Sequence, residues 1–140
     1  MKVTTDFKMA IIIDDSSPKG LQCNAAAVLS LTLGNKIEGL FGPDLHDKSG
    51  ALHIGITKYT LPILAAPKEK LQEMYLQALQ MKDELLLVDF TDVAQMTHDY
   101  DEYSEKLKKK NTEELTLSGI AIAGNKKVVN KLTGNLPLVR

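Results

Sequence analysis

The chain has 140 residues, a length that predicts one domain, because hydrophobic cores seldom divide at this size. Hydrophobic residues make up 44% of the sequence and charged residues 25%, which excludes a disordered tail, a collagen-like fibre or a low-complexity array. The 17 Lys and Arg residues nearly balance the 18 Asp and Glu residues, and the net charge is −1. The overall charge therefore attracts neither nucleic acid nor an anionic membrane surface.

The first strand is predicted at residues 8–14, where a β-branched run is continuous and does not alternate with polar residues. This pattern is typical of a central strand that is covered on both faces. The sequence Ser16–Pro18 follows, with a hydroxyl side chain to cap a helix and a proline at its first position. We expect this helix to run from Pro18 to Leu33, to be apolar around most of its circumference and to end at Gly34–Asn35.

Glycines interrupt the segment from Glu38 to Tyr59 too often for a long regular element, so a loop with a short hairpin is expected there. A second strand follows at residues 60–66, and its Pro62 suits either an edge strand or the first residues of a strand, because proline cannot donate to a ladder. Pro67 begins the next helix. Its apolar residues fall on one face, at positions 71, 74, 75, 78 and 81.

Residues 85–89 repeat the pattern of a buried strand and complete a β-α-β-α-β series. Such a series normally builds a sheet of parallel strands covered by helices. Residues 99–110 predict a surface helix with acids in its first turn and bases in its last. A fourth strand at residues 115–123 and a short helix at residues 126–132 complete a single α/β domain over residues 1–140, without repeats or linkers.

The sequence favours a cytoplasmic protein. The apolar stretch Met9–Ile13 is too short for a signal peptide, and no apolar stretch approaches the roughly 18 residues needed to span a bilayer. The single cysteine, Cys23, has no partner for an internal disulfide, and its spacing from the three histidines is unlike that of a structural zinc site. We therefore expect no membrane span, no metal and no cofactor.

Polar residues follow the first and third strands, where open α/β sheets place their ligand crevices. They are Asp14, Asp15 and Lys19 after the first strand and Asp89, Thr91, Asp92, Gln95, Thr97 and His98 after the third. If these strands are parallel neighbours, both groups meet at one edge of the sheet. An Asp and Lys pair there can position water or polarise a carbonyl group. The alternative is that both groups only form turns and cap helices.

Two further places hold candidate binding residues. Gln22 and Cys23 lie in the first turns of the first helix, where unpaired N–H groups favour anions. A reactive thiolate would fit there, although packing as a small apolar side chain is the commoner role of a free cysteine and the one we favour. Asp47 and His53 lie in the glycine-rich segment and are either site residues or ordinary surface residues.

The charge pattern argues against extended nucleic-acid binding. The segment Asp83–Glu105 holds eight acidic residues and no Lys or Arg, and Arg140 is the only arginine of the chain. Local acidity of this kind repels a polyanion, and the bidentate phosphate contacts that arginine makes are missing within the domain.

Three segments resemble the type 2 peptidyl-tRNA hydrolases: KMAIII in the first strand, GLQCNAAAV in the first helix, and LSGIAIAGNKKVVNKLTGNLPL at the C-terminus. The resemblance implies a three-layer α/β/α sandwich with a small, mostly parallel mixed sheet, and a homodimer. Ala25 stands where that family has a histidine, and Asp92 and Thr97 are one residue further apart than in its Asp-x-x-x-Thr element. The sequence is most similar to an uncharacterised bacterial branch of this superfamily.

The resemblance implies a hydrolase of acyl esters or amides. Lys19 would stabilise the developing oxyanion, Asp92 would orient or deprotonate water, and Thr97 or His98 would help to position it. The acidity near this site favours a small acyl substrate over peptidyl-tRNA, because tRNA binding demands clustered Lys and Arg. The alternative is a non-catalytic module that binds a small ligand or a protein on the same fold.

Overall fold

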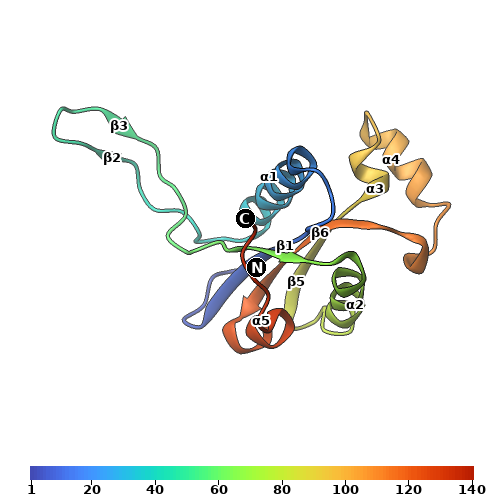
Figure 1. The fold of residues 1–140 in the computed structure, drawn as a ribbon. Helices are drawn as coiled ribbons and strands as arrows, with labels where there is room; N and C mark the ends of the chain where they lie inside the picture. The colour runs from blue at the N-terminus through green and yellow to red at the C-terminus, as the bar shows by residue number, and fades with distance from the viewer.

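The computed structural model describes residues 1–140 and is built around a four-stranded mixed sheet (Figure 1). The strands are β1 (Phe7–Asp14), β4 (Ile63–Ala66), β5 (Leu85–Thr91) and β6 (Leu117–Asn125), in the order β4-β1-β6-β5. β4 is parallel to β1, whereas β6 is antiparallel to both β1 and β5. The expected single-domain α/β fold with a mixed sheet is confirmed. Three strands share one direction, but only one pairing is parallel.

The position of β6 corrects one expectation from the sequence. β1 and β5 point the same way, yet they are not neighbours, because β6 lies between them. Ile12 of β1 is paired with Ile120, and Val88 of β5 is paired with Ala121. β6 carries buried side chains on both of its faces, so it occupies a central position that its place late in the chain does not indicate.

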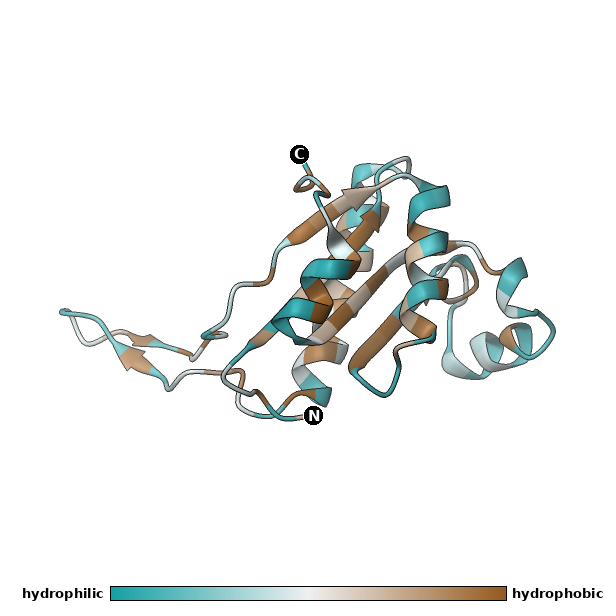
Figure 2. Ribbon diagram, turned by 90° about the horizontal axis from the view of Figure 1, so that it is seen from below, coloured by the Kyte–Doolittle hydropathy of each residue, from teal (hydrophilic) through white to brown (hydrophobic).

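Helices cover both faces of the sheet and complete three layers (Figures 1 and 2). They are α1 (Lys19–Lys36), α2 (Lys68–Leu79), α3 (Asp92–Gln95), α4 (Tyr100–Leu107) and α5 (Lys126–Thr133), with a 3-10 turn, η1 (Thr112–Glu114). On one face, Leu29 and Leu33 of α1 pack against β1 residues such as Ile11. On the other face, Leu71 of α2 and Val129 of α5 form the second half of the core.

The helices begin in different ways. Pro18 and Pro67 are the N-caps of α1 and α2, and neither helix has a side-chain cap. The expected serine cap on α1 is wrong, because the Ser17 hydroxyl donates to the carbonyl oxygen of Asp14. Asp99 does cap α4, since its carboxylate accepts from the backbone N–H of Glu102 at 2.8 Å.

A long hairpin arm extends from the body of the molecule (Figure 1). It comprises residues 41–58, which we call the arm, and contains two short antiparallel strands, β2 (Leu45–His46) and β3 (Leu52–His53). The loop with a short hairpin expected between Glu38 and Tyr59 is therefore confirmed. At the base of the arm, the ring of Phe41 lies beside Gly34 of α1, but none of the arm residues is buried.

The C-terminal tail covers the outer edge of β4. The backbone N–H of Ala65 donates to Pro137, and that of Val139 donates to Ile63, at 2.8 and 2.9 Å. β4 is at the edge of the sheet and begins just after Pro62, so both positions that the sequence allowed for this proline fit the structure. None of the helices has the length and apolar character required to cross a bilayer.

Candidate functional site

The carboxyl ends of β1, β4 and β5 meet at one edge of the sheet, as expected for strands of one direction. Asp14 lies there, but its buried carboxylate accepts from the backbone N–H and the hydroxyl of Ser16, at 2.9 and 2.6 Å. These bonds hold the turn between β1 and α1. Asp15 is exposed beside it, and its backbone N–H donates to Ala66. The structure thus uses Asp14 as a turn residue.

The segments that leave β1 and β5 do converge, through the side chain of Gln95. Its amide nitrogen donates to the carbonyl oxygen of Leu21 at 3.2 Å and to Asn24 at 3.4 Å. Its amide oxygen accepts from the hydroxyl of Ser118 at 2.8 Å. This side chain links the two segments by hydrogen bonds in the region where the sequence predicted a shared cavity.

The four residues expected to act in catalysis therefore line three separate pockets. Lys19 lines a pocket between α1, β4 and the C-terminal residues, which we call the tail pocket, and its ammonium donates to the carbonyl oxygen of Arg140. Asp92 lines another pocket beside α4. Thr97 and His98 line a third, which we call the β5 pocket. No one pocket holds all four side chains.

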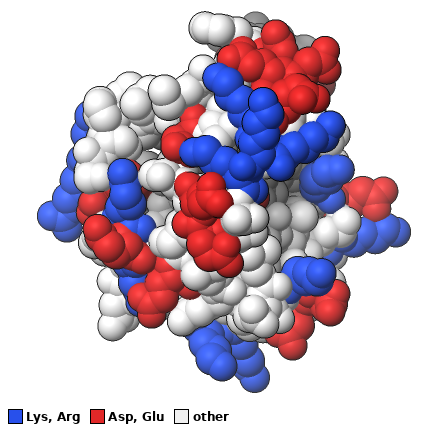
Figure 3. Space-filling view, turned by 90° about the vertical axis from the view of Figure 1, so that its right-hand side faces the viewer, with Lys and Arg blue, Asp and Glu red and all other residues white.

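Asp92 stabilises the start of α3 through hydrogen bonds to its carboxylate. One of its carboxylate oxygens accepts from the backbone N–H of Val93 at 2.9 Å and of Thr116 at 3.4 Å. Its pocket also contains Lys106, Lys109, Lys110 and Glu114. On this side of the molecule, lysines gather into a cluster with acidic side chains beside them (Figure 3).

Gln22 and Cys23 both line the tail pocket, but they differ in burial. Gln22 is buried and donates to the carbonyl oxygen of Ser17 at 2.7 Å, so it stabilises the turn before α1. Cys23 is exposed, and the expectation that it packs as a small apolar side chain is wrong. The buried face of α1 follows Gln22, Ala25, Leu29 and Leu33, and Cys23 lies outside that stripe.

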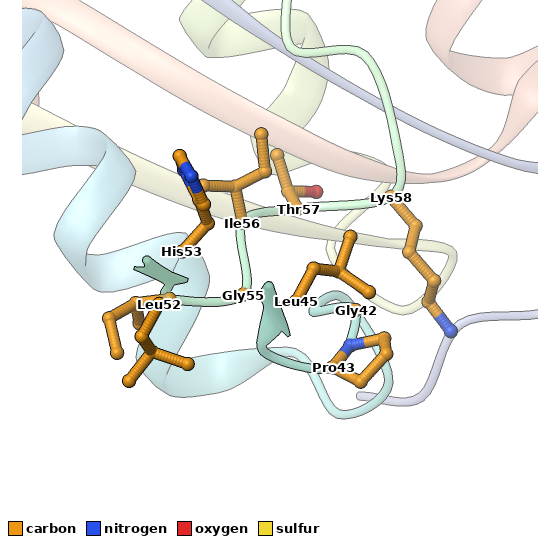
Figure 4. A pocket seen from close by; sticks show the side chains of 10 residues that line it. Gly42, Pro43, Leu45, Leu52, His53, Gly55, Ile56, Thr57 and Lys58 are labelled. Carbon is orange, nitrogen blue, oxygen red and sulfur yellow. The ribbon is translucent and has the colours of Figure 1, made fainter. Parts of the chain in front are cut away.

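Asp47 and His53 lie on the arm, away from the sheet edge. The imidazole of His53 contacts the Asp47 carboxylate at 2.9 Å, and Ser49 and Ala51 donate backbone N–H groups to the same carboxylate. The bond with His53 is the main reason why the pKa of Asp47 is lowered. His53 also lines a pocket between the two limbs of the arm, the arm pocket (Figure 4).

The β5 pocket brings together the largest variety of polar groups. Its cavity is about 480 Å³ and lies between α1, β5 and α4. Val28, Val88, Phe90 and Ala94 form its apolar walls, and Thr32, Asp89, Thr97, His98, Asp99, Tyr100 and Tyr103 supply polar atoms. An apolar pocket with a few convergent polar groups is the usual form of a small-ligand site.

Asp89 also lines this pocket; the sequence placed it among the polar residues after the third strand but gave it no catalytic or binding role. Burial raises the pKa of its carboxyl group, although a hydrogen bond from the Tyr75 hydroxyl, at 3.3 Å, lowers it. Burial, followed by the charge of Asp89, raises the pKa of Tyr75 to about 12 and also raises the pKa of Tyr103. A charged residue within the apolar strand LLLVDFT was the available signal, but the predicted strand ended at this residue.

No group of three or more His, Cys, Asp or Glu side chains is arranged to hold a metal ion. The ionisable residues of the β5 pocket are Asp89, His98, Asp99, Tyr100 and Tyr103. These groups can accept a hydrogen bond, attract a positive charge or transfer a proton.

Comparisons with known proteins place the chain among proteins whose activity has not been assigned. A family model described as a protein of unknown function, DUF2000, matches residues 7–140. The structure is similar to that of a protein of unknown function, Atu0240, from Agrobacterium tumefaciens. The TM-score is 0.86 at 17% sequence identity, over 96% of this chain and 98% of that one. None of the curated proteins matches the sequence.

Proposed function

Because the chain belongs to the DUF2000 family of proteins of unknown function, we propose a function from its own geometry: the β5 pocket binds a small organic cation with an apolar body. One observation carries this proposal. The partly buried carboxylate of Asp89 takes part in no ion pair of the chain. Burying an unpaired charge is costly, so a positively charged ligand would be stabilised there.

The surrounding charge favours the same kind of ligand. Asp99 lines the pocket together with Asp89, and the segment from Asp83 to Glu105 contains no Lys or Arg. A concave surface with one sign of charge concentrates ligands of the opposite sign. An ammonium or amidinium group fits this field, whereas a phosphate or carboxylate would be repelled.

Aromatic and aliphatic side chains provide the rest of the site. The rings of Tyr100 and Tyr103 meet edge to face, with their centres 5.4 Å apart. Tyrosine rings attract cations through their faces, by about 0.5–1 kcal/mol when exposed and more when desolvated. The apolar walls formed by Val28, Val88 and Phe90 would cover the uncharged part of the ligand.

A titration with matched probes tests this proposal. Benzylamine and benzyl alcohol have similar shapes, but only the amine is cationic at neutral pH. We expect benzylamine to shift the NMR signals of residues 94–103, and we expect Asp89→Asn to weaken its binding about tenfold, or about 1.4 kcal/mol. The matched control Asp101→Asn removes an exposed acid of α4 that does not line the pocket, and it should leave the affinity unchanged. Equal binding of the alcohol and the amine would contradict the role of charge.

Hydrolysis of an acyl ester or amide is a second candidate, because Thr97 and His98 line the same pocket as Asp89. A carboxyl group with a raised pKa suits general base catalysis near neutral pH. Asp89 would take a proton from water, the water oxygen would attack the acyl carbon, and the alcohol or amine would leave with a proton. The resemblance to type 2 peptidyl-tRNA hydrolases supports this reaction class, while the acidity of the pocket favours a cationic acyl substrate over tRNA.

Turnover measurements separate the two candidates. Acetylcholine, an ester that carries a quaternary ammonium group, and peptidyl-tRNA are suitable probes. If the pocket is catalytic, Asp89→Asn and His98→Ala should abolish turnover of the ester. Lys19→Ala and Asp92→Ala should leave it unchanged, because these two residues line other pockets. Absence of turnover with both probes would leave ligand binding as the function of the pocket.

A further inference from the structure

The arm exposes several large apolar side chains. Its large apolar residues are Phe41, Leu45, Leu52, Ile54 and Ile56, and each is at least half exposed, up to 78% for Ile56. The projecting hairpin carries hydrophobic segments, drawn in brown in Figure 2. Large apolar side chains that are exposed together on one element often mark an interaction site.

The arm nevertheless has a defined conformation. The backbone N–H of Gly42 donates to Ile56 at 2.9 Å at the base, and that of Gly55 donates to the Asp44 carboxylate at 2.8 Å. At the tip, the carboxylate of Asp47 holds the turn. The limbs approach so closely that a Cβ on Gly55 would collide with the backbone of Gly42. Since an isolated two-stranded hairpin is at best marginally stable, a hairpin built this way is best explained by a partner that covers it.

The charges of the arm do not select a charged partner. Asp44 and Asp47 are balanced by Lys48 and Lys58. In the arm pocket, Leu45, Leu52 and Ile56 lie around the space between the limbs, and Lys58 is its one lysine (Figure 4). The binding energy of this surface must therefore come mainly from apolar burial.

The body of the same chain carries an apolar pocket of about 410 Å³ beside the base of the arm. We call it the α1 pocket. Its apolar lining residues include Leu31, Leu33, Leu40 and Leu61 of the body and Phe41 at the base of the chain's own arm. Leu31 is 76% exposed on α1, although the helix buries its opposite face in the core.

We propose that the arm binds a second copy of this chain, and that the arm of each copy lies in the α1 pocket of the other. One chain presents both a projecting apolar element and an apolar pocket, and a two-fold dimer would occupy both at once. The arm points away from its own body (Figure 1), so a second molecule is needed to cover it. Residues 41–58 together with the lining of the pocket reach the roughly 20–30 residues per partner of a stable interface.

Sedimentation velocity of variants that each carry one new charge tests this interface. We expect the wild-type chain to be a dimer. Ile54→Asp on the arm and Leu31→Lys in the α1 pocket should each weaken the dimer at least tenfold, because an unpaired charge would be buried. Both residues are largely exposed in one chain, at 68% and 76%, so the variants should keep the circular dichroism spectrum of the wild type. The control Met96→Asp, at a residue 74% exposed beside α3, should remain a dimer.

Mixing the two variants gives the decisive result. A heterodimer of Ile54→Asp with Leu31→Lys has one wild-type contact and one contact in which the new charges are opposite. We therefore expect the mixture to recover the dimer that each variant alone has lost. A mixture that stays monomeric would overturn the placement of the arm in the α1 pocket.

A wild-type chain that is monomeric at every concentration would overturn the proposal as a whole. In that case, binding of the wild type but not of Ile54→Asp to phosphatidylcholine vesicles would assign the arm to a lipid surface instead. A wild-type dimer that Ile54→Asp leaves intact would place the interface elsewhere and would also overturn it. None of these outcomes depends on ligand binding in the β5 pocket.

Discussion

The carboxyl group of Asp89 determines how stability should respond to pH. Burial raises its pKa in the folded chain above that of the unfolded chain, so the folded state binds the proton more tightly. The free energy of unfolding must then fall as the pH rises from the ordinary aspartate pKa through the raised one. We expect Asp89→Asn to remove this fall and to be at least as stable as the wild type at neutral pH, as measured by urea denaturation across the acidic range.

Tyr75→Phe changes the other partner of the same hydrogen bond and should destabilise the fold. It removes the hydrogen bond to Asp89 and should lower the free energy of unfolding by about 1–2 kcal/mol at neutral pH. The loss should shrink in acid, where the carboxyl group is protonated. If Asp89→Asn and the wild type show the same pH dependence, the carboxyl group is solvated and the ligand proposal loses its main support.

Gly119 should tolerate no side chain. A Cβ at this position of β6 would lie 2.9 Å from the Ile13 side chain and 3.0 Å from the carbonyl oxygen of Ile12. Overpacking of this kind costs about 1–3 kcal/mol. Gly119→Ala should therefore lower the free energy of unfolding by that amount, as measured by chemical denaturation. The control Gly20→Ala adds a Cβ on α1 with nothing within 4 Å, and it should be neutral or stabilising. Equal effects of the two substitutions would contradict the close packing of β6 against β1.

At the scale of elements, Gln95 joins the segments that follow β1 and β5. Gln95→Ala would remove its bonds to Leu21, Asn24 and Ser118, at a cost of about 1 kcal/mol. We expect amide hydrogen exchange to accelerate in the first turns of α1 and in α3, while α2 stays protected. Gln77→Ala, at an exposed position of α2 without side-chain hydrogen bonds, is the control. Exchange that is unchanged in α1 would show that this contact does not hold the two segments together.

Local sequence patterns predicted most of these elements, because burial on one or both faces leaves a direct trace in the order of residues. The continuous apolar run of β1 and the helical spacing of Leu71, Met74 and Ala78 are examples. The order of the strands was not predictable in this way, since the placement of β6 between β1 and β5 is decided by packing between distant segments. For the same reason, the sequence did not show that Gln95 would join the segments after β1 and β5 by hydrogen bonds.

The candidate site shows a similar division. Thr97 and His98 were predicted as site residues and do line the β5 pocket, whereas Asp89 was expected nearby but without a catalytic or binding role. Its importance comes from partial burial, which depends on the tertiary environment. The exposed side chains of the arm are a second example, because leucine and isoleucine in a glycine-rich segment do not reveal whether anything covers them.

At the scale of the whole molecule, exchange of arms would couple folding to association. Only folded chains can form the dimer, so a higher protein concentration must stabilise the folded state by mass action. A tenfold increase in concentration changes the free energy by about 1.4 kcal/mol, and for a unit of this size we expect Tm to rise by about 2–4 °C. Differential scanning calorimetry over a range of concentrations would measure this shift.

The variant Ile54→Asp should melt at one temperature throughout that range, at or below the lowest wild-type value. A wild-type Tm that does not change with concentration would mean that the arm contributes nothing to the stability of the folded chain through association.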